Sequence, residues 1–456
     1  MSKIIILGAG LSGISASFHL GHENCVVLEK NYHPGGRIHT EFLNGFTWDE
    51  GPHMSFTKHA YVKNLFAENV EDDYLEYPVQ TGNYFHGYWI PHPAQTNLYA
   101  VPQPLRDQCL QDFLIARQQK NFFSPKNYQD WLNYAFGKSF SENFPSAYTR
   151  KYWTTDPANL STEWVGERVY FPSIEDVTKG ATAPLERQTH YIKKIRYPKK
   201  GGYFAFAQKM ISGSNILYNH ELTHISFKEK KIYFKNNNII SFDKLVITMP
   251  LPEIVHLSDA PAEIQEAADY LSCTSLLLIN ITAGHSTVRP ENWLYIYDED
   301  KYATRINCTE KLSPLNAPAG KTGIQVEVYF SKFKPVSESK ELIAQKVCEE
   351  LVEMGVIKSA GLIESIHTKW VPWANVIFDH PYREALDIIL NWLEKYGLER
   401  EYDDLEPVTD WNKKLSSSNN AKGQNLFFSG RYAQWKYYWS DDCVMRSFYI
   451  LDNLNI

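Results

Sequence analysis

The sequence predicts an α/β fold in which a parallel sheet, a mixed sheet and a helical insertion interleave along the chain. Residues 3–29 have the pattern of strand, tight glycine turn, helix and second buried strand. Apolar spacing over residues 105–148, a stretch rich in Gln, Asn and Lys, predicts inserted helices. Apolar runs at 275–281 and 323–329 predict strands of a second sheet, followed by an amphipathic helix at 337–354. At 456 residues the chain exceeds one hydrophobic core, so two or three domains are expected.

The glycine turn near the N-terminus has the spacing of a phosphate-binding motif. Gly8, Gly10 and Gly13 lie between the first strand and the first helix, where backbone N–H groups can approach a pyrophosphate at the helix N-terminus. Glu29 follows at the end of the second strand, where a carboxylate can accept hydrogen bonds from ribose hydroxyls. Together these residues predict a Rossmann-type dinucleotide-binding unit.

The remaining patterns divide the chain into segments. Residues 216–234 alternate apolar and polar positions as a hairpin does, and 244–248 form a buried strand that returns to the nucleotide-binding domain. A polar loop at 416–423 precedes a strand at 425–430 and a final helix through Leu454. We expect a first nucleotide-binding segment (1–100), a helical insertion (101–170), a second nucleotide-binding segment with the hairpin (171–255), a substrate domain with a mixed sheet (256–415) and a C-terminal cofactor-contacting strand and helix (416–456).

Composition argues against several classes of function. The formal charge of −7 supplies no basic face for nucleic acid. No apolar run reaches the length of a membrane span, and the first apolar run is too short for a signal peptide. Aromatic residues make up 14% of the chain, which suits either a cleft for flat or sugar-like ligands or simply an aromatic core. The cysteines form no CxxC pair, so we expect no metal site, no disulfide scaffold and reduced thiols in a cytoplasmic protein; they are Cys25, Cys109, Cys273, Cys308, Cys348 and Cys443.

Two further segments distinguish FAD from NAD as the dinucleotide. His33-Pro34-Gly35-Gly36-Arg37 resembles the second glycine turn of FAD enzymes in the amine oxidase and protoporphyrinogen oxidase superfamily. The segment from Phe428 to Trp435, with a helix start at Ser440, resembles the C-terminal flavin-contacting strand and helix of that superfamily. The resemblance implies an FAD-binding domain of the glutathione reductase-like kind, with cofactor contacts from Gly36, Arg37, Gly430, Arg431 and Trp435.

Within this superfamily the sequence is most similar to UDP-galactopyranose mutase-like flavoenzymes. The loop Gly51-Pro52-His53-Met54-Ser55-Phe56 resembles their flavin-proximal loop. Monoamine oxidases usually carry small residues where this chain has Trp435, Tyr437, Tyr438 and Trp439, whereas 439–443 departs from the Asn and Asp-His pattern of eukaryotic-type mutases. Further resemblances to the mutases follow in order at 58–62, 87–98, 152–154, 164–168, 197–202, 293–295 with Arg305, and 430–437.

The resemblance implies roles for individual side chains. Arg168 and Arg305 would hold the diphosphate of a nucleotide sugar, since guanidinium stays charged and binds phosphate oxygens in a planar fork. For any single arginine the alternative is a structural salt bridge. His53 would lie over the flavin, although a lone histidine is more often a satisfied structural group. Further substrate contacts are expected from Gln95, Asn97 and Tyr437.

The implied reaction is covalent catalysis by reduced FAD that interconverts the pyranose and furanose forms of a nucleotide-linked sugar in cell-surface polysaccharide or glycoconjugate biosynthesis. NADPH or NADH would serve only as the reductant, and an oligomer is possible. One alternative is an FAD-dependent oxidoreductase that takes a hydride from an amine or another small molecule, which the Gly35-Gly36-Arg37 turn fits better. Another is a flavin-binding subunit without catalytic activity.

Overall fold

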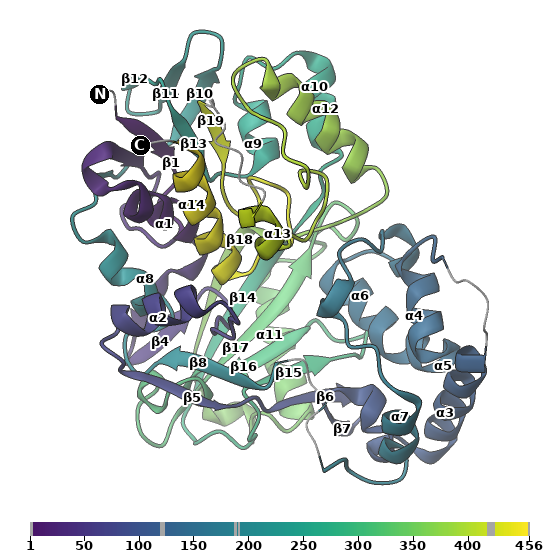
Figure 1. Ribbon diagram of the computed structural model, residues 1–456. Coiled ribbons are helices and arrows are strands. Elements are labelled where there is room, and N and C mark those ends of the chain that lie inside the picture. The colour runs from purple at the N-terminus through teal and green to yellow at the C-terminus, as the bar shows by residue number, and fades with distance from the viewer. Residues whose placement is uncertain (1–2, 119–123, 187–188, 190–191, 417–424, 455–456) are drawn as a thin grey trace.

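The computed structural model describes residues 3–118, 124–186, 189, 192–416 and 425–454. Two large sheets form the centre of the molecule, and a lobe of helices projects to one side (Figure 1). The predicted α/β class with a parallel sheet is confirmed. Apart from Ser416, the polar loop predicted at 416–423 lies outside the described residues.

The five-stranded sheet is entirely parallel and gathers strands from distant parts of the chain. Its central strand is fully buried, because helices α1 (Leu11–Leu20) and α14 (Ser440–Leu454) pack together beside it. The first and last segments of the chain therefore meet in one domain (Figure 1). In spatial order the strands are β19 (Leu426–Phe428), β13 (Leu245–Ile247), β1 (Ile4–Leu7), β2 (Cys25–Leu28) and β9 (Ile216–Leu217).

The predicted hairpin forms, but it starts later than the pattern indicated. Strands β10 (Leu222–Ser226), β11 (Lys231–Phe234) and β12 (Ile239–Ser241) make an antiparallel sheet of their own. Residues 216–217 instead form β9 at the edge of the parallel sheet, beside Val27 and Leu28. Parallel pairing with a distant strand leaves no local periodic signal, so alternation alone did not separate β9 from the hairpin.

The seven-stranded sheet is mixed, because β15 pairs with β6 in parallel while all other strand pairs of the sheet are antiparallel. Two of its strands, β6 and β7, come from residues 81–91, so the segment predicted as the first part of the nucleotide-binding domain contributes to both large sheets. In spatial order the strands are β18 (Ile363–Val376), β14 (Cys273–Ala283), β17 (Thr322–Phe330), β16 (Arg305–Cys308), β15 (Trp293–Ile296), β6 (Thr81–Phe85) and β7 (Tyr88–Pro91).

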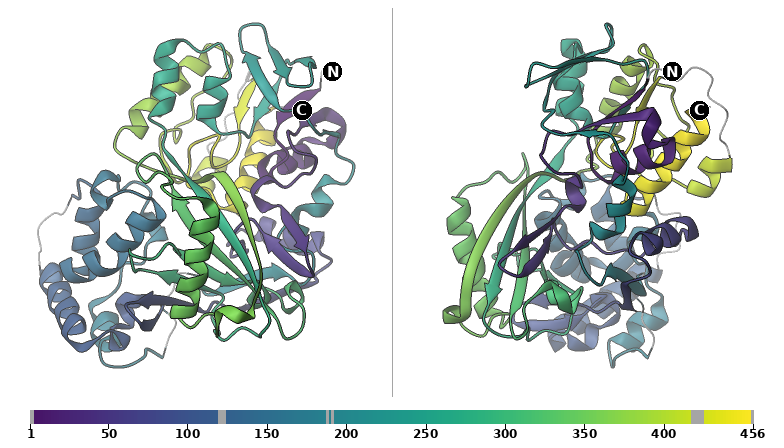
Figure 2. Two further views of the ribbon diagram at one scale, coloured as in Figure 1. Left: turned by 180° about the vertical axis from the view of Figure 1, so that it is seen from behind. Right: turned by 90° about the vertical axis from the view of Figure 1, so that its left-hand side faces the viewer.

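Helix α11 (Lys340–Glu353) covers one face of this sheet, as the view from behind shows (Figure 2). Its N-cap is Ser339, whose side chain accepts a hydrogen bond from Leu342 N. Strand alternation sends Ile324, Val326 and Val328 toward α11 and the residues between them to the opposite face. That opposite face is turned toward the parallel sheet.

The segment predicted as a helical insertion, 101–170, lies in a lobe beside the second sheet, and the lobe continues through residues 174–180, which were assigned to the second nucleotide-binding segment (Figure 1). Lys151 ties the lobe to the sheet domain: its Nζ donates to Asp298 O at 2.6 Å and Ala303 O at 2.8 Å, and the side chain is buried. Burial lowers the pKa of Lys151 to about 7. The lobe helices are α3 (Gln103–Gln118), α4 (Tyr128–Phe136), α5 (Lys138–Ser141), α6 (Ala147–Tyr152) and α7 (Ile174–Gly180).

The other elements are short strands and helices around the two sheets. None of the helices within the described ranges is long and apolar enough to cross a membrane. These elements are β3 (Thr40–Leu43), β4 (Phe46–Asp49), β5 (Tyr74–Pro78), β8 (Lys194–Pro198), α2 (Ala60–Asn69), α8 (Ala205–Gln208), α9 (Leu251–His256), α10 (Ala262–Asp269), α12 (Tyr382–Glu394) and α13 (Trp411–Ser416).

Candidate functional site

A cavity of about 820 Å³ lies between the two large sheets. One end is lined by the glycine turn after β1, and the other by the cavity-facing residues of β14 to β18. The C-terminal segment 430–440 contributes part of the wall. Because segments from both ends of the chain line one space, the cavity is the candidate functional site.

Close packing of the glycine turns shapes the first end. A Cβ on Gly13 would stand 1.9 Å from Gly8 O, so glycine is required there for α1 to pack on β1. Gly35 N donates to Ala9 O at 2.8 Å, and a Cβ on Gly36 would stand 2.9 Å from Gly10 Cα. The two predicted turns are thus in contact, at the N-terminus of α1, where no side chain caps the helix.

Glu29 lies beside this turn at the end of β2. Its Oε2 accepts a hydrogen bond from Ala9 N at 2.7 Å, and its Oε1 accepts from Asn31 N and Asn31 Nδ2, each at 2.9 Å. The carboxylate lines the cavity and is fixed by these donors. Oε2 has a second lone pair, with which it can accept a hydrogen bond from a ribose hydroxyl.

Charged side chains continue along the cavity wall. Arg37 Nη1 donates to Glu50 Oε2 at 3.0 Å, and Lys369 Nζ lies 2.6 Å from Glu50 Oε1. Lys369 also donates to Glu41, on β3. Arg37 therefore reaches the cavity as part of a network that fixes its position.

The cavity face of the second sheet carries a row of aligned residues. In register across the strands stand Tyr295 on β15, Arg305 on β16, Glu327 on β17, Leu278 on β14 and Lys369 on β18. All of them except Leu278 line the cavity. Side chains at such aligned positions on one face are neighbours, so Tyr295, Arg305 and Glu327 form a polar strip, which Leu278 separates from Lys369.

Arg305 and Glu327 are the central pair of this row. Arg305 Nη2 donates to Glu327 Oε1 at 2.9 Å, and Arg305 Nε donates to Glu327 Oε2. Glu327 is 2% exposed. Although burial opposes it, the Glu327 carboxylate raises the pKa of Arg305 well above its ordinary value. Three of the five guanidinium N–H groups remain directed away from Glu327.

Tyrosines surround this pair. Tyr152 OH donates to Asn375 Oδ1 at 3.0 Å, whereas Tyr148 OH is buried without a hydrogen-bond partner among the described residues. Tyr329 OH hydrogen-bonds to Glu327. Burial raises the pKa of Tyr148 and Tyr329 well above the ordinary value, so their hydroxyls stay protonated and can donate.

His53 lines the cavity between the two ends. Its Nδ1 lies 3.0 Å from Gly51 O, and since a carbonyl only accepts, Nδ1 carries the proton and Nε2 has a lone pair. Burial, followed by the nearby Arg37, lowers the pKa of His53 to about 3. The ring is therefore neutral at physiological pH.

Arg168 stands behind the cavity wall instead of lining the cavity. Its guanidinium lies 4.0 Å from the Trp439 ring centroid and 4.6 Å from that of Tyr437, both of which line the cavity. Its Nη2 is 4.0 Å from Asp442 Oδ2. Arg168 thus supports two aromatic rings of the wall.

The other predicted site residues divide between the cavity and its surroundings. The cavity lining includes Gly430, Arg431 and Tyr437 but neither Gln95 nor Asn97. Asn97 Nδ2 bonds to Pro93 O at 2.9 Å within its own turn. Trp435 is fully buried behind the wall, 6.5 Å from Trp373 between ring centroids. The resemblance to a known family identified the segments that contain Gln95, Asn97 and Trp435, but a short match in sequence does not show where a side chain points.

Several lining residues were absent from the sequence-based set. Glu327 and Tyr329 lie in a run read only as a strand, although Gln325, Glu327 and Tyr329 alternate with apolar residues. This alternation of polar residues along one face of a buried strand is the signal that could have identified Glu327 and Tyr329 from the sequence. Lys369, Trp373 and Asn375, on β18, had no comparable signal.

Comparisons with known proteins agree with this architecture. A family model described as flavin containing amine oxidoreductase matches residues 11–445. The chain is 24% identical over 418 residues to a 4,4'-diapophytoene desaturase of Staphylococcus aureus, covering 76% of this chain and 80% of the relative. A zeta-carotene-forming phytoene desaturase of Myxococcus xanthus is 42% identical over 76 residues, 16% of this chain and 15% of the relative.

Solved structures extend the similarity to the whole fold. A reduced UDP-galactopyranose mutase matches with a TM-score of 0.87 and 22% identity, covering 100% of this chain and 94% of that one. A variant of putrescine oxidase matches with a TM-score of 0.60 and 12% identity, covering 98% of each chain. At these identities the structures establish a shared fold.

The protein is therefore a flavoenzyme and belongs to the flavin-containing amine oxidoreductase family. The predicted superfamily and the flavin cofactor are confirmed. The structure fits FAD on its own evidence: paired glycine turns meet the uncapped N-terminus of α1, and the fixed carboxylate of Glu29 lies beside them. A Cβ on Gly430 would stand 2.5 Å from Ser12 Oγ, so the C-terminal wall closely approaches this helix start.

Proposed function

We propose that this flavoenzyme acts on a nucleotide-linked sugar and interconverts its pyranose and furanose forms. The observation that carries the proposal is the polar strip on the second sheet, where Tyr295, Arg305 and Glu327 line one cavity with FAD-type glycine turns. Hydroxyl, guanidinium and carboxylate groups match the hydroxyls and diphosphate of such a ligand. The fold shared with a reduced UDP-galactopyranose mutase supports the same assignment.

In this proposal the chain's own residues bind, orient and shield the sugar. Arg305, held by Glu327, directs its remaining N–H groups toward the diphosphate. Tyr148 donates a hydrogen bond from its hydroxyl to the ligand, and the aromatic wall excludes water from the reacting carbon. His53 offers Nε2 as an acceptor for a sugar hydroxyl. Bound FAD, when reduced, supplies the nucleophile of the reaction.

The test is a reaction under anaerobic conditions. Protein with FAD reduced by dithionite, NADPH or NADH is incubated with a panel of nucleotide sugars, and products are separated by chromatography. We expect a ring isomer of one sugar, formed only by reduced protein and with no net change in flavin oxidation state. Bleaching of the oxidised flavin by a non-sugar substrate, without ring isomerisation of any sugar, would contradict the proposal.

A second candidate function is net oxidation of an amine or another reduced small molecule. It is favoured by the family description and by the desaturase relatives, and Trp293, Trp370 and Trp373 give the cavity apolar walls. The same anaerobic experiment separates the two, because an oxidoreductase reduces its flavin with substrate alone.

A further inference from the structure

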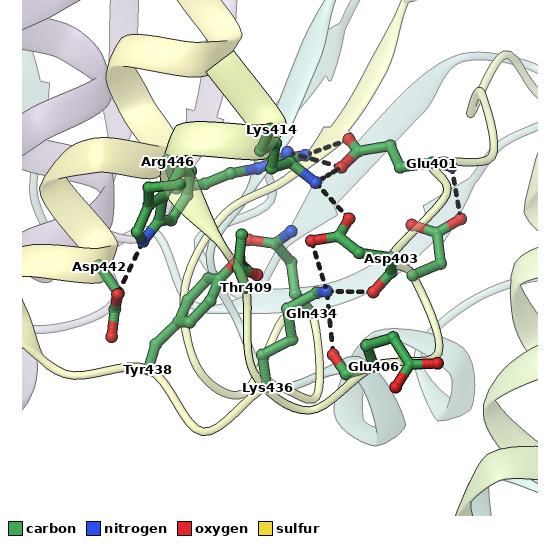
Figure 3. Close-up of polar contacts among 12 residues, drawn as sticks. Glu401, Asp403, Glu406, Thr409, Lys414, Gln434, Lys436, Tyr438, Asp442 and Arg446 are labelled. Carbon is green, nitrogen blue, oxygen red and sulfur yellow. Dashed lines mark hydrogen bonds and ion pairs between the residues drawn. The ribbon is translucent and has the colours of Figure 1, made fainter. Parts of the chain in front are cut away.

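A cluster of buried charges lies outside the lining of the cofactor cavity, and Figure 3 shows its contacts. It contains Glu401, Asp403, Lys414, Lys436 and Arg446. The three cations are at most 2% exposed, and none of the five residues lines the cavity. Burying charged groups costs free energy unless each has well-placed partners, so a cluster of five buried charges indicates a structural or functional role.

Each cation of the cluster has at least one carboxylate partner within it. Arg446 binds both oxygens of Glu401, at 2.8 Å and 3.0 Å. Lys414 bridges the two carboxylates, Glu401 and Asp403. Lys436 Nζ lies 3.3 Å from Asp403 Oδ2 and also donates to the backbone carbonyls of Asp403 and Glu406, the latter at 3.0 Å. These contacts join segment 401–416 to Lys436 in the wall segment and to Arg446 in α14.

Two of these cations are linked to segment 430–440, which forms part of the cavity wall: Arg446 bonds just before this segment, and Lys436 belongs to it. Arg446 Nε donates to Phe428 O at 3.0 Å, just before Gly430. Lys436 follows Arg431 in a tight turn, in which Lys436 N donates to Arg431 O at 3.0 Å, and it directly precedes Tyr437. The cluster therefore anchors the wall at its beginning and near its end.

The wall has a conformation that needs such anchoring. Trp435 has a φ of 55°, in the left-handed region that a bulky side chain rarely adopts. Beyond it, Tyr437 N donates to Pro407 O at 2.7 Å, and Thr409 Oγ1 lies 3.0 Å from Tyr438 OH. Segment 401–416 thus holds the strained turn from the side opposite the cavity.

We infer that Lys436 and Arg446 are positioning residues for the cofactor, which act through the wall that carries Gly430, Arg431 and Tyr437. They hold this wall at the distance from α1 that bound FAD requires. The inference depends on flavin binding and not on the identity of the substrate.

The test compares FAD affinity with stability in two variants of similarly buried lysines. Lys436→Met removes one anchor, whereas Lys151→Met removes a lysine that is equally buried and bonded to carbonyls but joins the helical lobe to the second sheet. Apoprotein is titrated with FAD by fluorescence, melting of the apoprotein is recorded, and visible circular dichroism reports the setting of the bound flavin.

We expect Lys436→Met to weaken FAD binding by about tenfold or more and to alter the flavin dichroism. Lys151→Met should lower the apoprotein melting temperature with FAD affinity and dichroism close to wild type. Should Lys436→Met not fold, Arg446→Lys keeps the charge but loses the planar fork and serves as the milder variant, with weaker FAD binding expected. Wild-type FAD affinity and dichroism in the folded anchor variant would overturn the inference and leave the cluster a stabilising role alone.

Discussion

Arg305 and Glu327 stand directly opposite each other on β16 and β17 and form a two-point ion pair on the cavity face of the second sheet. Arg305 is the proposed ligand of the diphosphate, and with Glu327 it also forms a buried charge pair in the sheet. These two properties are separable by experiment, because stability can be measured without substrate.

Arg305→Leu should destabilise the protein by about 3–5 kcal/mol, since it leaves the Glu327 carboxylate buried without its counterion. The double variant Arg305→Leu with Glu327→Leu should recover most of this loss. Urea unfolding of both variants measures the difference. A double variant no more stable than the single one would show that Glu327 is not the source of the cost.

Two glycines of the first turn should respond differently to alanine. Gly13→Ala places Cβ against Gly8 O and should disrupt the packing of α1 on β1. At Gly10 the nearest atom to an added Cβ is Gly36 Cα at 3.8 Å and the backbone has φ −72°, so the apoprotein should tolerate Gly10→Ala. FAD affinity should still fall by about tenfold or more, because the methyl group obstructs the close approach of the pyrophosphate.

Melting curves of the apoprotein and FAD titration distinguish these two outcomes. Equal loss of stability in both alanine variants would contradict the geometric distinction, as would unchanged FAD affinity in Gly10→Ala.

Arg168→Met should weaken nucleotide-sugar binding by about fivefold, because the cation supports the Tyr437 and Trp439 rings, a contact worth about 1 kcal/mol. FAD binding should be retained. The matched control is Arg117→Met, which removes another stacked arginine, 3.8 Å from the Phe171 ring centroid in the helical lobe. Calorimetric titration with nucleotide sugars measures both, and equal affinities in the two variants would exclude Arg168 from this role.

Lys151 should make stability rise with pH. Its folded-state pKa is about 7, below its ordinary value, so the unfolded chain binds more protons above pH 7. Between about pH 7 and about pH 9 wild type should gain about 2 kcal/mol relative to Lys151→Met. Chemical unfolding across this range tests the difference; a constant difference would mean that Lys151 does not titrate there.

Local patterns predicted the cofactor end of the site better than the other end. Gly8, Gly10 and Glu29 belong to one continuous βαβ unit, whose turn chemistry depends on neighbours in sequence. The partnership of Arg305 with Glu327 depends on strand register, and the support of Arg168 depends on rings from the last segment of the chain. Both sets of contacts join residues that are far apart in the sequence. The family resemblance therefore identified Arg168 and Arg305 but not the residues that they contact.

The apolar periodicity of the sequence also predicted the helices of the lobe, but it did not predict that Lys151 is buried against the second sheet domain. Strand β9 and the contribution of β6 to the second sheet required long-range pairing that alternation cannot specify.

The meeting of α1 with α14 has a consequence for synthesis of the protein. The ribosome makes the glycine turn at Gly8–Gly13 some four hundred residues before the strand, turn and helix that form the opposite wall of the cavity. A nascent chain can form the βαβ unit of β1, α1 and β2 early, but it then has only one wall of the cofactor cavity. Productive capture of FAD must therefore be a late event, coupled to docking of the final helix.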